Sequence, residues 1–177
     1  MSVINTAEAI SSCRIKMPHA IIEAVDFCGQ STLEVQVSAL KALLIELKEL
    51  GFETLIDLSG VDYIDPEKKT RVFYWLAHPM NFERLRIVVS VERDGQVPSI
   101  TDLWEGAAWY ERELFDLFGV HFSGHEQLRR ILMPDDWEGH PLRRDYALTE
   151  EAVEFKHGVK PKVPSKIIPY VQISKRS

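Results

Sequence analysis

The chain has 177 residues, 45% of them hydrophobic, a length that suits one well-buried domain and falls short of two ordinary ones. Its 21 lysines and arginines against 27 aspartates and glutamates give a net charge of -6, which argues against a general role in binding nucleic acid phosphates. The apolar stretches are far shorter than the roughly 20 residues of a membrane-spanning helix, and the N-terminal segment lacks the pattern of a secretory signal. We therefore expect a cytoplasmic protein that meets a membrane only through a partner or its surface.

The N-terminal half predicts two strands followed by a helix. After about fifteen residues that we expect to be loose, residues 20–27 and 31–37 favour strand and are separated by a short turn. Residues 38–52 have helical spacing, with Ser38 as the expected N-cap and Gly51 at the end. The apolar stripe of this helix consists of Leu40, Leu43, Leu44, Leu47 and Leu50.

Three further strands are predicted at residues 54–64, 71–78 and 85–92, with turn-rich connections between them. A helix is then predicted from Asp102 to Phe118, with Thr101 as its N-cap. The element order is ββαβββα. This order indicates an α+β domain in which helices cover an antiparallel sheet.

The predicted helix at residues 102–118 places two residues on unexpected faces. Glu111 falls near the middle of its apolar half, whereas Trp109 falls on the polar half together with Asp116. An ionised carboxylate within an apolar face requires a partner. We expect Glu111 to pair with an arginine, either of the segment that follows, as a clasp, or of a neighbouring subunit, and we favour the clasp. Trp109 is expected to face a neighbouring protein.

Residues 119–177 show little periodic apolar signal and are predicted to form an extended, largely irregular arm rather than a second domain. The expected division is therefore an α+β domain at residues 1–118 and a partner-binding arm at residues 119–177. The basic, proline-spaced residues 156–177 favour a polyproline-like conformation. Apolar residues suited to contact with another protein are Ile167, Ile168, Tyr170, Val171 and Ile173.

Two arginine doublets in the arm lie among aromatic and aliphatic residues, a composition that is enriched at interface hot spots. We expect these doublets and their neighbours to contact a partner or to hold the arm. The candidates are Trp109, Glu111, Arg112, Glu113, His125, Arg129, Arg130, Trp137, His140, Arg143, Arg144, Asp145 and Tyr146.

The sequence indicates no catalytic, cofactor-binding or metal-binding residue in this chain. Cys13 and Cys28 are too few for an iron–sulfur cluster, and no nucleotide-binding motif is present. His121 and His125, with acidic residues near Asp135, raise the alternative of a free-standing metal-dependent enzyme, but the residues between the histidines are typical of a loop. We expect these histidines to donate hydrogen bonds that order the coil. A soluble assembly factor is a further alternative.

Residues 101–148 closely resemble the signature region of the 30-kilodalton subunit family of proton-pumping NADH:quinone oxidoreductase, respiratory complex I. Residues 51–63 resemble the same family more loosely. The residues that carry the hallmark are Glu111-Arg112-Glu113, Leu114-Phe115, His125 and Arg129-Arg130.

The resemblance implies a non-catalytic core subunit of the peripheral arm, which scaffolds the quinone-site and iron–sulfur subunits. It implies contact with the 49-kilodalton subunit and with iron–sulfur subunits, and places FMN, iron–sulfur clusters and quinone on those partners. It also implies a peripheral location on the cytoplasmic side of the inner membrane. Hydrogenase-like and plastoquinone-linked complexes use the same family, so the electron donor stays open.

Overall fold

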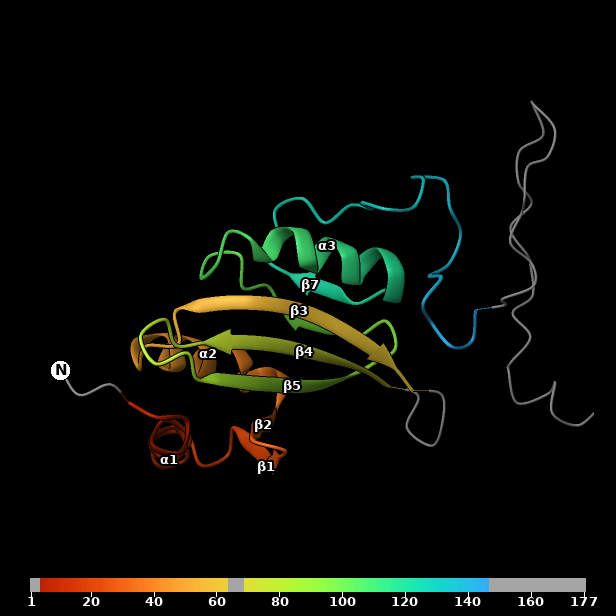
Figure 1. Ribbon diagram of the computed structural model, residues 1–177. Coiled ribbons are helices and arrows are strands. Elements are labelled where there is room, and N and C mark those ends of the chain that lie inside the picture. Colours follow the sequence, from red (N-terminus) through yellow and green to blue (C-terminus); the bar gives the residue numbers. More distant parts are fainter. Residues whose placement is uncertain (1–3, 64–68, 147–177) are drawn as a thin grey trace, which may run out of the picture.

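The computed structural model describes residues 4–63 and 69–146, and a five-stranded sheet forms its centre (Figure 1). The predicted contacts of residues 156–177 lie outside the described residues. The strands occur in the order β1-β2-β5-β4-β3. Their bounds are β1 Ile21–Phe27, β2 Gln30–Val35, β3 Thr54–Asp62, β4 Lys69–Ala77 and β5 Arg84–Glu92.

The sheet is antiparallel except where β2 pairs with β5 in parallel. After β2 the chain forms a helix and the β3–β4 hairpin, and β5 then enters between the hairpin and β2. The α+β class is thus confirmed, and the sheet is mixed because this crossover brings β5 back in the direction of β2. A second, two-stranded parallel sheet pairs β6 (Gln96–Pro98) with β7 (His121–Ser123).

The first helix, α1 (Thr6–Lys16), corrects the expectation that the N-terminal residues are loose. Its start carries a capping box, in which the Asn5 side chain accepts from the Glu8 amide and the Glu8 side chain accepts from the Asn5 amide. The helix buries only two small residues, Ala9 and Cys13. So small a buried face leaves almost no periodic signal in the sequence.

The other helices begin later than predicted. A 3-10 turn at Val37–Ala39 precedes α2 (Leu40–Glu49), so the prediction of Ser38 as its N-cap is wrong. Helix α3 spans Ala107–Phe118, and the prediction that it begins at Asp102 is also wrong. Residues 101–106 form turns instead, because the carbonyl of Ile100 accepts the amides of both Leu103 and Trp104. No helix within the described ranges is long and apolar enough to cross a membrane.

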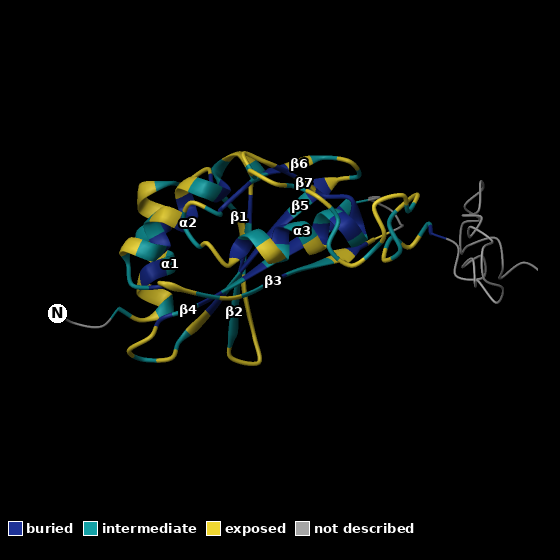
Figure 2. Cartoon of the chain, turned by 90° about the horizontal axis from the view of Figure 1, so that it is seen from above, coloured by how far each residue is buried: buried dark blue, intermediate teal, exposed yellow. Residues whose placement is uncertain are grey.

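The helices α2 and α3 cover one face of the sheet, and the hydrophobic core lies between them and the strands (Figure 2). Gly60 of β3 shares this face with its neighbours Val72 and Val89. A Cβ at Gly60 would stand 2.7 Å from Leu114 Cδ2 of α3. The glycine therefore permits the close approach of α3 to the sheet.

Replacing Gly60 with valine tests this approach. We expect Gly60→Val to lower the free energy of unfolding by about 1 to 3 kcal/mol, because the added side chain overpacks the contact with Leu114. Chemical denaturation of the isolated chain measures the change. Gly106→Ala is the matched control, since a Cβ at Gly106 meets nothing within 4 Å. Equal stability of the two variants would contradict the packing argument.

Candidate functional site

Helix α3 holds two completely buried carboxylates, Glu111 and Asp116, and both bind backbone amides of neighbouring segments. Five residues apart on a helix, they are separated by about 140° around its axis. Each is therefore available to a different part of the chain.

Glu111 binds the loop that precedes α3. Its Oε2 accepts the Ser99 hydroxyl at 2.7 Å, and its Oε1 accepts the Ile100 amide at 2.8 Å. Burial raises the pKa of Glu111, and the two hydrogen bonds oppose this rise without cancelling it. The predicted pairing of Glu111 with an arginine of the arm is therefore wrong. Both oxygens of its carboxylate are bound by the loop before α3 and not by an arginine of the arm.

Asp116 is the residue that holds the arm. Its Oδ2 accepts three successive amides, those of Ile131, Leu132 and Met133, at 3.0, 2.8 and 2.8 Å. Its Oδ1 accepts the guanidinium of Arg130 at 2.6 Å. The expectation that Asp116 lies on the solvated half of the helix is wrong, because the arm covers that half.

The charge of Asp116 is stabilised by these donors. Burial by itself raises the pKa of Asp116, but the three amides and the guanidinium of Arg130 together outweigh burial, so the pKa is lowered. The carboxylate is consequently ionised at neutral pH. Charge-assisted hydrogen bonds of this kind are about twice as strong as those between neutral groups.

Two arginines complete this attachment by binding carbonyl groups. Arg130 Nη2 donates to the carbonyls of Trp137 and Gly139 at 2.9 and 3.0 Å, which closes the segment 131–139 around its guanidinium. Arg112 of α3 donates to the carbonyls of Arg129 and Arg130 at 3.1 and 3.0 Å. The helix thus binds the backbone of the arm through both donors and acceptors.

The C-terminal end of α3 binds the next part of the arm. Arg143 Nε donates to the Phe118 carbonyl at 2.6 Å, and its Nη2 donates to Asp94 at 2.6 Å. His140 Nδ1 lies 2.8 Å from the carbonyl of Asp116. Gly119 ends the helix at φ +73°, where a Cβ would stand 2.6 Å from the His140 ring. A side chain at this position would prevent the arm from closing over the helix end.

A third attachment joins the arm to the sheet through residues that the sequence did not single out. Buried Asp62 of β3 accepts Arg93 at 2.9 Å and the amide of Arg144 at 3.0 Å. Arg93 also pairs with Asp145 of the arm. Asp62 and Arg93 lie in separate strand and turn segments, so no local spacing in the sequence relates them to the arm.

The other predicted residues occupy the surface or the arm itself. Trp109 is 62% exposed, as expected for a residue that faces outward, and Arg112 stacks on it at 5.1 Å. Glu113, Arg129 and the side chain of Arg144 are exposed, whereas Tyr146 is buried against Gly139. Trp137 is half-buried within the loop that Arg130 closes.

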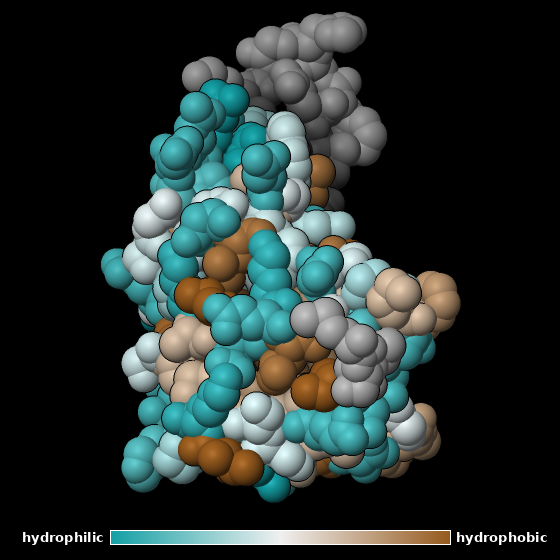
Figure 3. Space-filling model, turned by 90° about the vertical axis from the view of Figure 1, so that its left-hand side faces the viewer, coloured by the Kyte–Doolittle hydropathy of each residue, from teal (hydrophilic) through white to brown (hydrophobic). Residues whose placement is uncertain are grey.

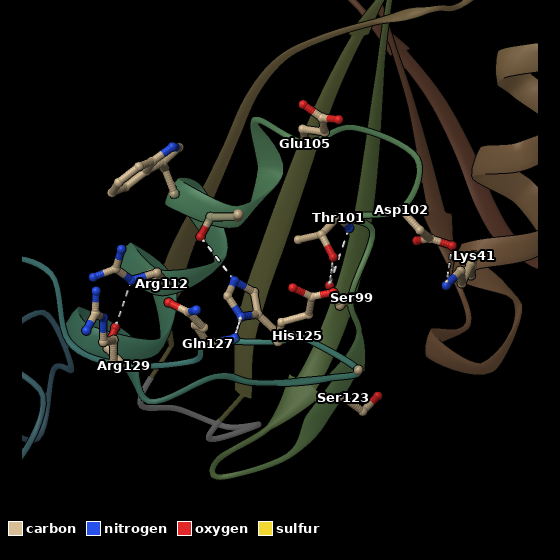
Figure 4. A pocket seen from close by; sticks show the side chains of 14 residues that line it. Lys41, Ser99, Thr101, Asp102, Glu105, Arg112, Ser123, His125, Gln127 and Arg129 are labelled. Carbon is tan, nitrogen blue, oxygen red and sulfur yellow. Dashed lines mark hydrogen bonds and ion pairs between the residues drawn. The ribbon is translucent and has the colours of Figure 1, made fainter.

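A pocket of about 700 Å³ opens beside the N-terminal half of α3 (Figure 4). Charges of both signs line it, including the ion pair between Lys41 and Asp102 at 2.9 Å. His125 closes one side, with Nε2 3.2 Å from the Ala108 carbonyl and Nδ1 accepting the Gln127 amide at 3.0 Å. One ring nitrogen therefore contacts helix α3 and the other binds the coil.

The two histidines of the alternative metal site, His121 and His125, have separate surroundings in the part of the chain that is described. His121 packs edge-on against Phe115 with ring centroids 5.2 Å apart, while His125 contacts the start of the same helix. Within residues 4–63 and 69–146, no three side chains of histidine, cysteine, aspartate or glutamate are grouped to hold a metal ion. The arrangement is suited to holding an extended segment against a helix.

Comparisons with known proteins agree on one family. The family described as respiratory-chain NADH dehydrogenase, 30 Kd subunit, matches residues 33–152. An NADH-quinone oxidoreductase subunit of Roseiflexus sp. (strain RS-1) is 41% identical over 156 residues, which cover 86% of this chain and 90% of that protein. The subunit of the same name from Brucella ovis is 44% identical over 139 residues, which cover 77% of this chain and 69% of that protein.

Two solved structures are similar in fold. The trypsin-resistant fragment (1-134) of Nqo5 has a TM-score of 0.62 and 28% identity, covering 71% of this chain and all of that fragment. A chain of the membrane-bound sulfane sulfur reductase, an archaeal respiratory membrane complex, has a TM-score of 0.71 and 24% identity. The match covers 81% of this chain and 86% of that one. At this lower identity the second likeness concerns the fold alone.

Replacing Asp116 with asparagine tests the attachment of the arm. Asp116→Asn would leave Arg130 without its carboxylate, a loss on the order of 3 kcal/mol for a buried pair broken on one side. We expect residues 124–146 to become rapidly cleavable in limited proteolysis while the sheet stays folded. Asp135→Asn, at an exposed position in the same arm, is the control and should leave the cleavage rate unchanged.

The attachment of the arm through Asp116 should weaken as the pH falls. A carboxyl group whose pKa is lowered on folding adds stability above its unfolded pKa of about 4 and loses it as the pH falls through the folded value. Protection of the arm in the wild-type chain should thus be complete at neutral pH and disappear in acid below about pH 4. Protection that increases on acidification would contradict the role of Asp116.

Replacing Glu111 with glutamine should have a different result. Because the pKa of Glu111 is raised on folding, wild-type stability falls as the pH rises from about 4.3, the unfolded value, through the folded value. Glu111→Gln removes this dependence, and we expect the variant to gain stability relative to the wild type between about pH 4 and pH 7. Denaturation at several pH values measures the difference. Rapid cleavage of the arm in this variant would instead restore the clasp hypothesis.

Proposed function

The chain belongs to the 30-kilodalton subunit family of respiratory-chain NADH dehydrogenase, and we propose that it serves its complex as a scaffold with no active site of its own. Its relatives are named as a subunit of NADH-quinone oxidoreductase, one of the core subunits in the peripheral arm of complex I. Its part in proton-translocating electron transfer from NADH to quinone is to hold and position neighbouring subunits.

The fixed shape of the arm is the observation that carries this proposal. Asp116, Arg112 and Arg130 bind its backbone from the inner side, which leaves apolar side chains on the outer side. Leu132 and Leu142 are 62% and 52% exposed. A segment held in one conformation before binding loses less entropy when a partner docks. This arrangement favours a protein partner over a small substrate.

The cofactors of the complex are proposed to reside on other chains. Cys13 and Cys28 lie in different elements, one buried in α1 and one exposed in the β1–β2 turn. Burial raises the pKa of the Cys13 thiol to about 11, which disfavours the thiolate that binds metals. These two cysteines support placing the iron–sulfur clusters on partner subunits, and FMN and quinone are proposed to lie there as well.

The proposed neighbours are the 49-kilodalton subunit and iron–sulfur subunits, on the cytoplasmic side of the inner membrane. The division between a domain at residues 1–118 and a partner-binding arm at residues 119–177 stays part of this proposal. Strand β7 is the part of that arm that pairs with the domain, and Val120 and Phe122 reach its core. Both pieces therefore contribute to one rigid unit near α3.

Exposed apolar residues also lie at the end of the sheet that is far from the arm, where β4 and β5 are joined. Met80 and Phe82 are 73% and 82% exposed there. Figure 3 looks at this end and shows hydrophobic patches within a largely hydrophilic surface. A subunit with several neighbours is expected to expose apolar residues on more than one side.

The two arginines of the second doublet have different expected roles. Arg143 bonds within the chain, so Arg143→Ala should loosen the arm of the isolated protein. The side chain of Arg144 is exposed, and Arg144→Ala should leave the isolated chain intact.

The test is assembly of the native complex with a tagged chain purified from membranes. Wild-type chain should copurify with the 49-kilodalton subunit and with NADH:quinone activity. Trp109→Ala should reduce the assembled fraction about tenfold or more, since exposed tryptophans at interfaces commonly contribute about 2 kcal/mol or more. Ile15→Ala, at an 82% exposed position on α1, is the control. Recovery of the chain alone, with membrane activity unchanged by its deletion, would refute the proposal.

A further inference from the structure

The second face of the five-stranded sheet is uncovered within the described residues. In Figure 1 helix α2 lies behind the strands and α3 lies along β3, while no helix crosses β3, β4 and β5 on the side toward the viewer. Cross-strand pairing defines two rows on this face. The first row is Val25, Thr32, Arg86, Trp75 and Asp57, and the second is Glu23, Glu34, Val88, Phe73 and Ser59. We call this surface the open face.

Arginine and aromatic side chains occupy the middle of the open face. The guanidinium of Arg86 lies 5.2 Å from the Trp75 ring and 5.9 Å from the Phe73 ring, and its Nε donates to Thr32 Oγ1 at 2.9 Å. Arg71, in the next row of β4, lies 5.3 Å from the ring of Tyr63. Stacking holds the two guanidinium groups in place before any partner binds.

These two arginines differ from the others that organise the fold. Arg93, Arg130 and Arg143 each form an ion pair with an aspartate. Within the described residues, neither Arg71 nor Arg86 has a carboxylate at ion-pair distance. Two oriented cations beside the half-buried rings of Phe73 and Trp75 and the exposed ring of Tyr63 form a combination that recognises carboxylates at protein interfaces.

The other side of the open face is acidic. Glu23 and Glu34 face the arginines across a groove of about 220 Å³ whose floor is Val88, and Glu34 accepts the Ser90 hydroxyl at 3.0 Å. The groove is smaller than the roughly 300 to 1,000 Å³ of typical ligand pockets, so it suits a few side chains of a protein. The opposed charges give any bound segment a preferred direction.

We propose that the open face is a docking surface for an acidic, partly apolar segment of a partner subunit. Carboxylates of that segment bind Arg71 and Arg86, its apolar residues cover Val88 and Phe73, and Glu23 repels a segment bound in the reverse direction. This inference rests on the proposed scaffold function, because it requires a neighbouring subunit in the complex.

The charges on the open face favour an acidic segment of a partner subunit over nucleic acid, this chain's own C-terminal residues and a second copy of the chain. Nucleic acid would bring phosphates against Glu23 and Glu34, on a chain of net charge -6. The C-terminal residues 147–177 contain five lysines and one arginine against three glutamates, a net charge of +3, so they would place an excess of cations against Arg71 and Arg86. A second copy would bring another net negative charge to the same surface.

Photocrosslinking in the assembled complex identifies the occupant. A photoreactive amino acid at Ser59, beside Phe73 on the open face, should crosslink to one partner subunit at a peptide rich in aspartate or glutamate. The same amino acid at exposed Ser11 of α1 is the control and should not label that peptide. Crosslinks to a second copy, to this chain's own C-terminal residues or to nucleic acid, or no crosslink at all, would overturn the proposal.

Charge reversal then tests the two arginines. Arg71→Glu with Arg86→Glu should reduce the assembled fraction about tenfold, as expected for hot-spot arginines, while the isolated chain stays folded at the temperature of the assay. Arg14→Glu, exposed on α1, is the matched control. Replacing the crosslinked carboxylates of the partner with lysine should restore assembly of the double variant.

The outcomes separate this inference from the scaffold function. If the double variant assembles like the wild type while Trp109→Ala does not, the docking surface is refuted and the scaffold function stands. If the wild-type chain is absent from the membrane complex, the scaffold function itself fails. A third outcome concerns stability. If the double variant has a lowered melting temperature, and Arg86→Lys is equally unstable but still assembles normally, the role of the open face in docking is also refuted.

Discussion

The carboxylate of Asp116 is the contact on which the shape of residues 124–146 depends. This segment has no helix or strand, so its backbone groups lack the regular partners that a sheet or helix provides. One buried oxygen of Asp116 gathers three successive amides, and the other oxygen orients Arg130, whose remaining donors bind two carbonyls farther along. One charged residue of the domain thus orders the first part of this irregular segment, and Arg112, Arg143 and Asp62 add further contacts.

The two buried carboxylates of helix α3 bind different segments of the chain, one before the helix and one after it. Glu111 binds the loop before α3 with two donors, which do not outweigh the effect of burial on its pKa. Asp116 binds the segment after α3 with four donor groups, one of them charged, and its pKa is lowered. The number and charge of the donors therefore decide which carboxylate is easily ionised. Helix α3 is consequently fixed to the chain on both of its sides.

The surfaces that remain available point in different directions. The arm covers one side of α3, and Trp109 projects from the same helix. The apolar residues Met80 and Phe82 lie at one end of the sheet, and the open face lies opposite the helices. A single-domain protein gains several non-overlapping contacts in this way without enlarging its core. This geometry agrees with a family whose members work inside a multi-subunit complex.

The sequence by itself determined the α+β class, the leucine stripe of α2 and the outward position of Trp109, because local periodicity carries these features. The signature residues at 101–148 were sufficient to indicate the family. Only the tertiary structure decided which carboxylate binds the arm, since the arm covers part of a helix face that periodicity assigns to solvent. The parallel pairing of β2 with β5 and the Asp62–Arg93 attachment also depend on contacts between distant segments. Such contacts leave no local pattern in the sequence from which they could be predicted.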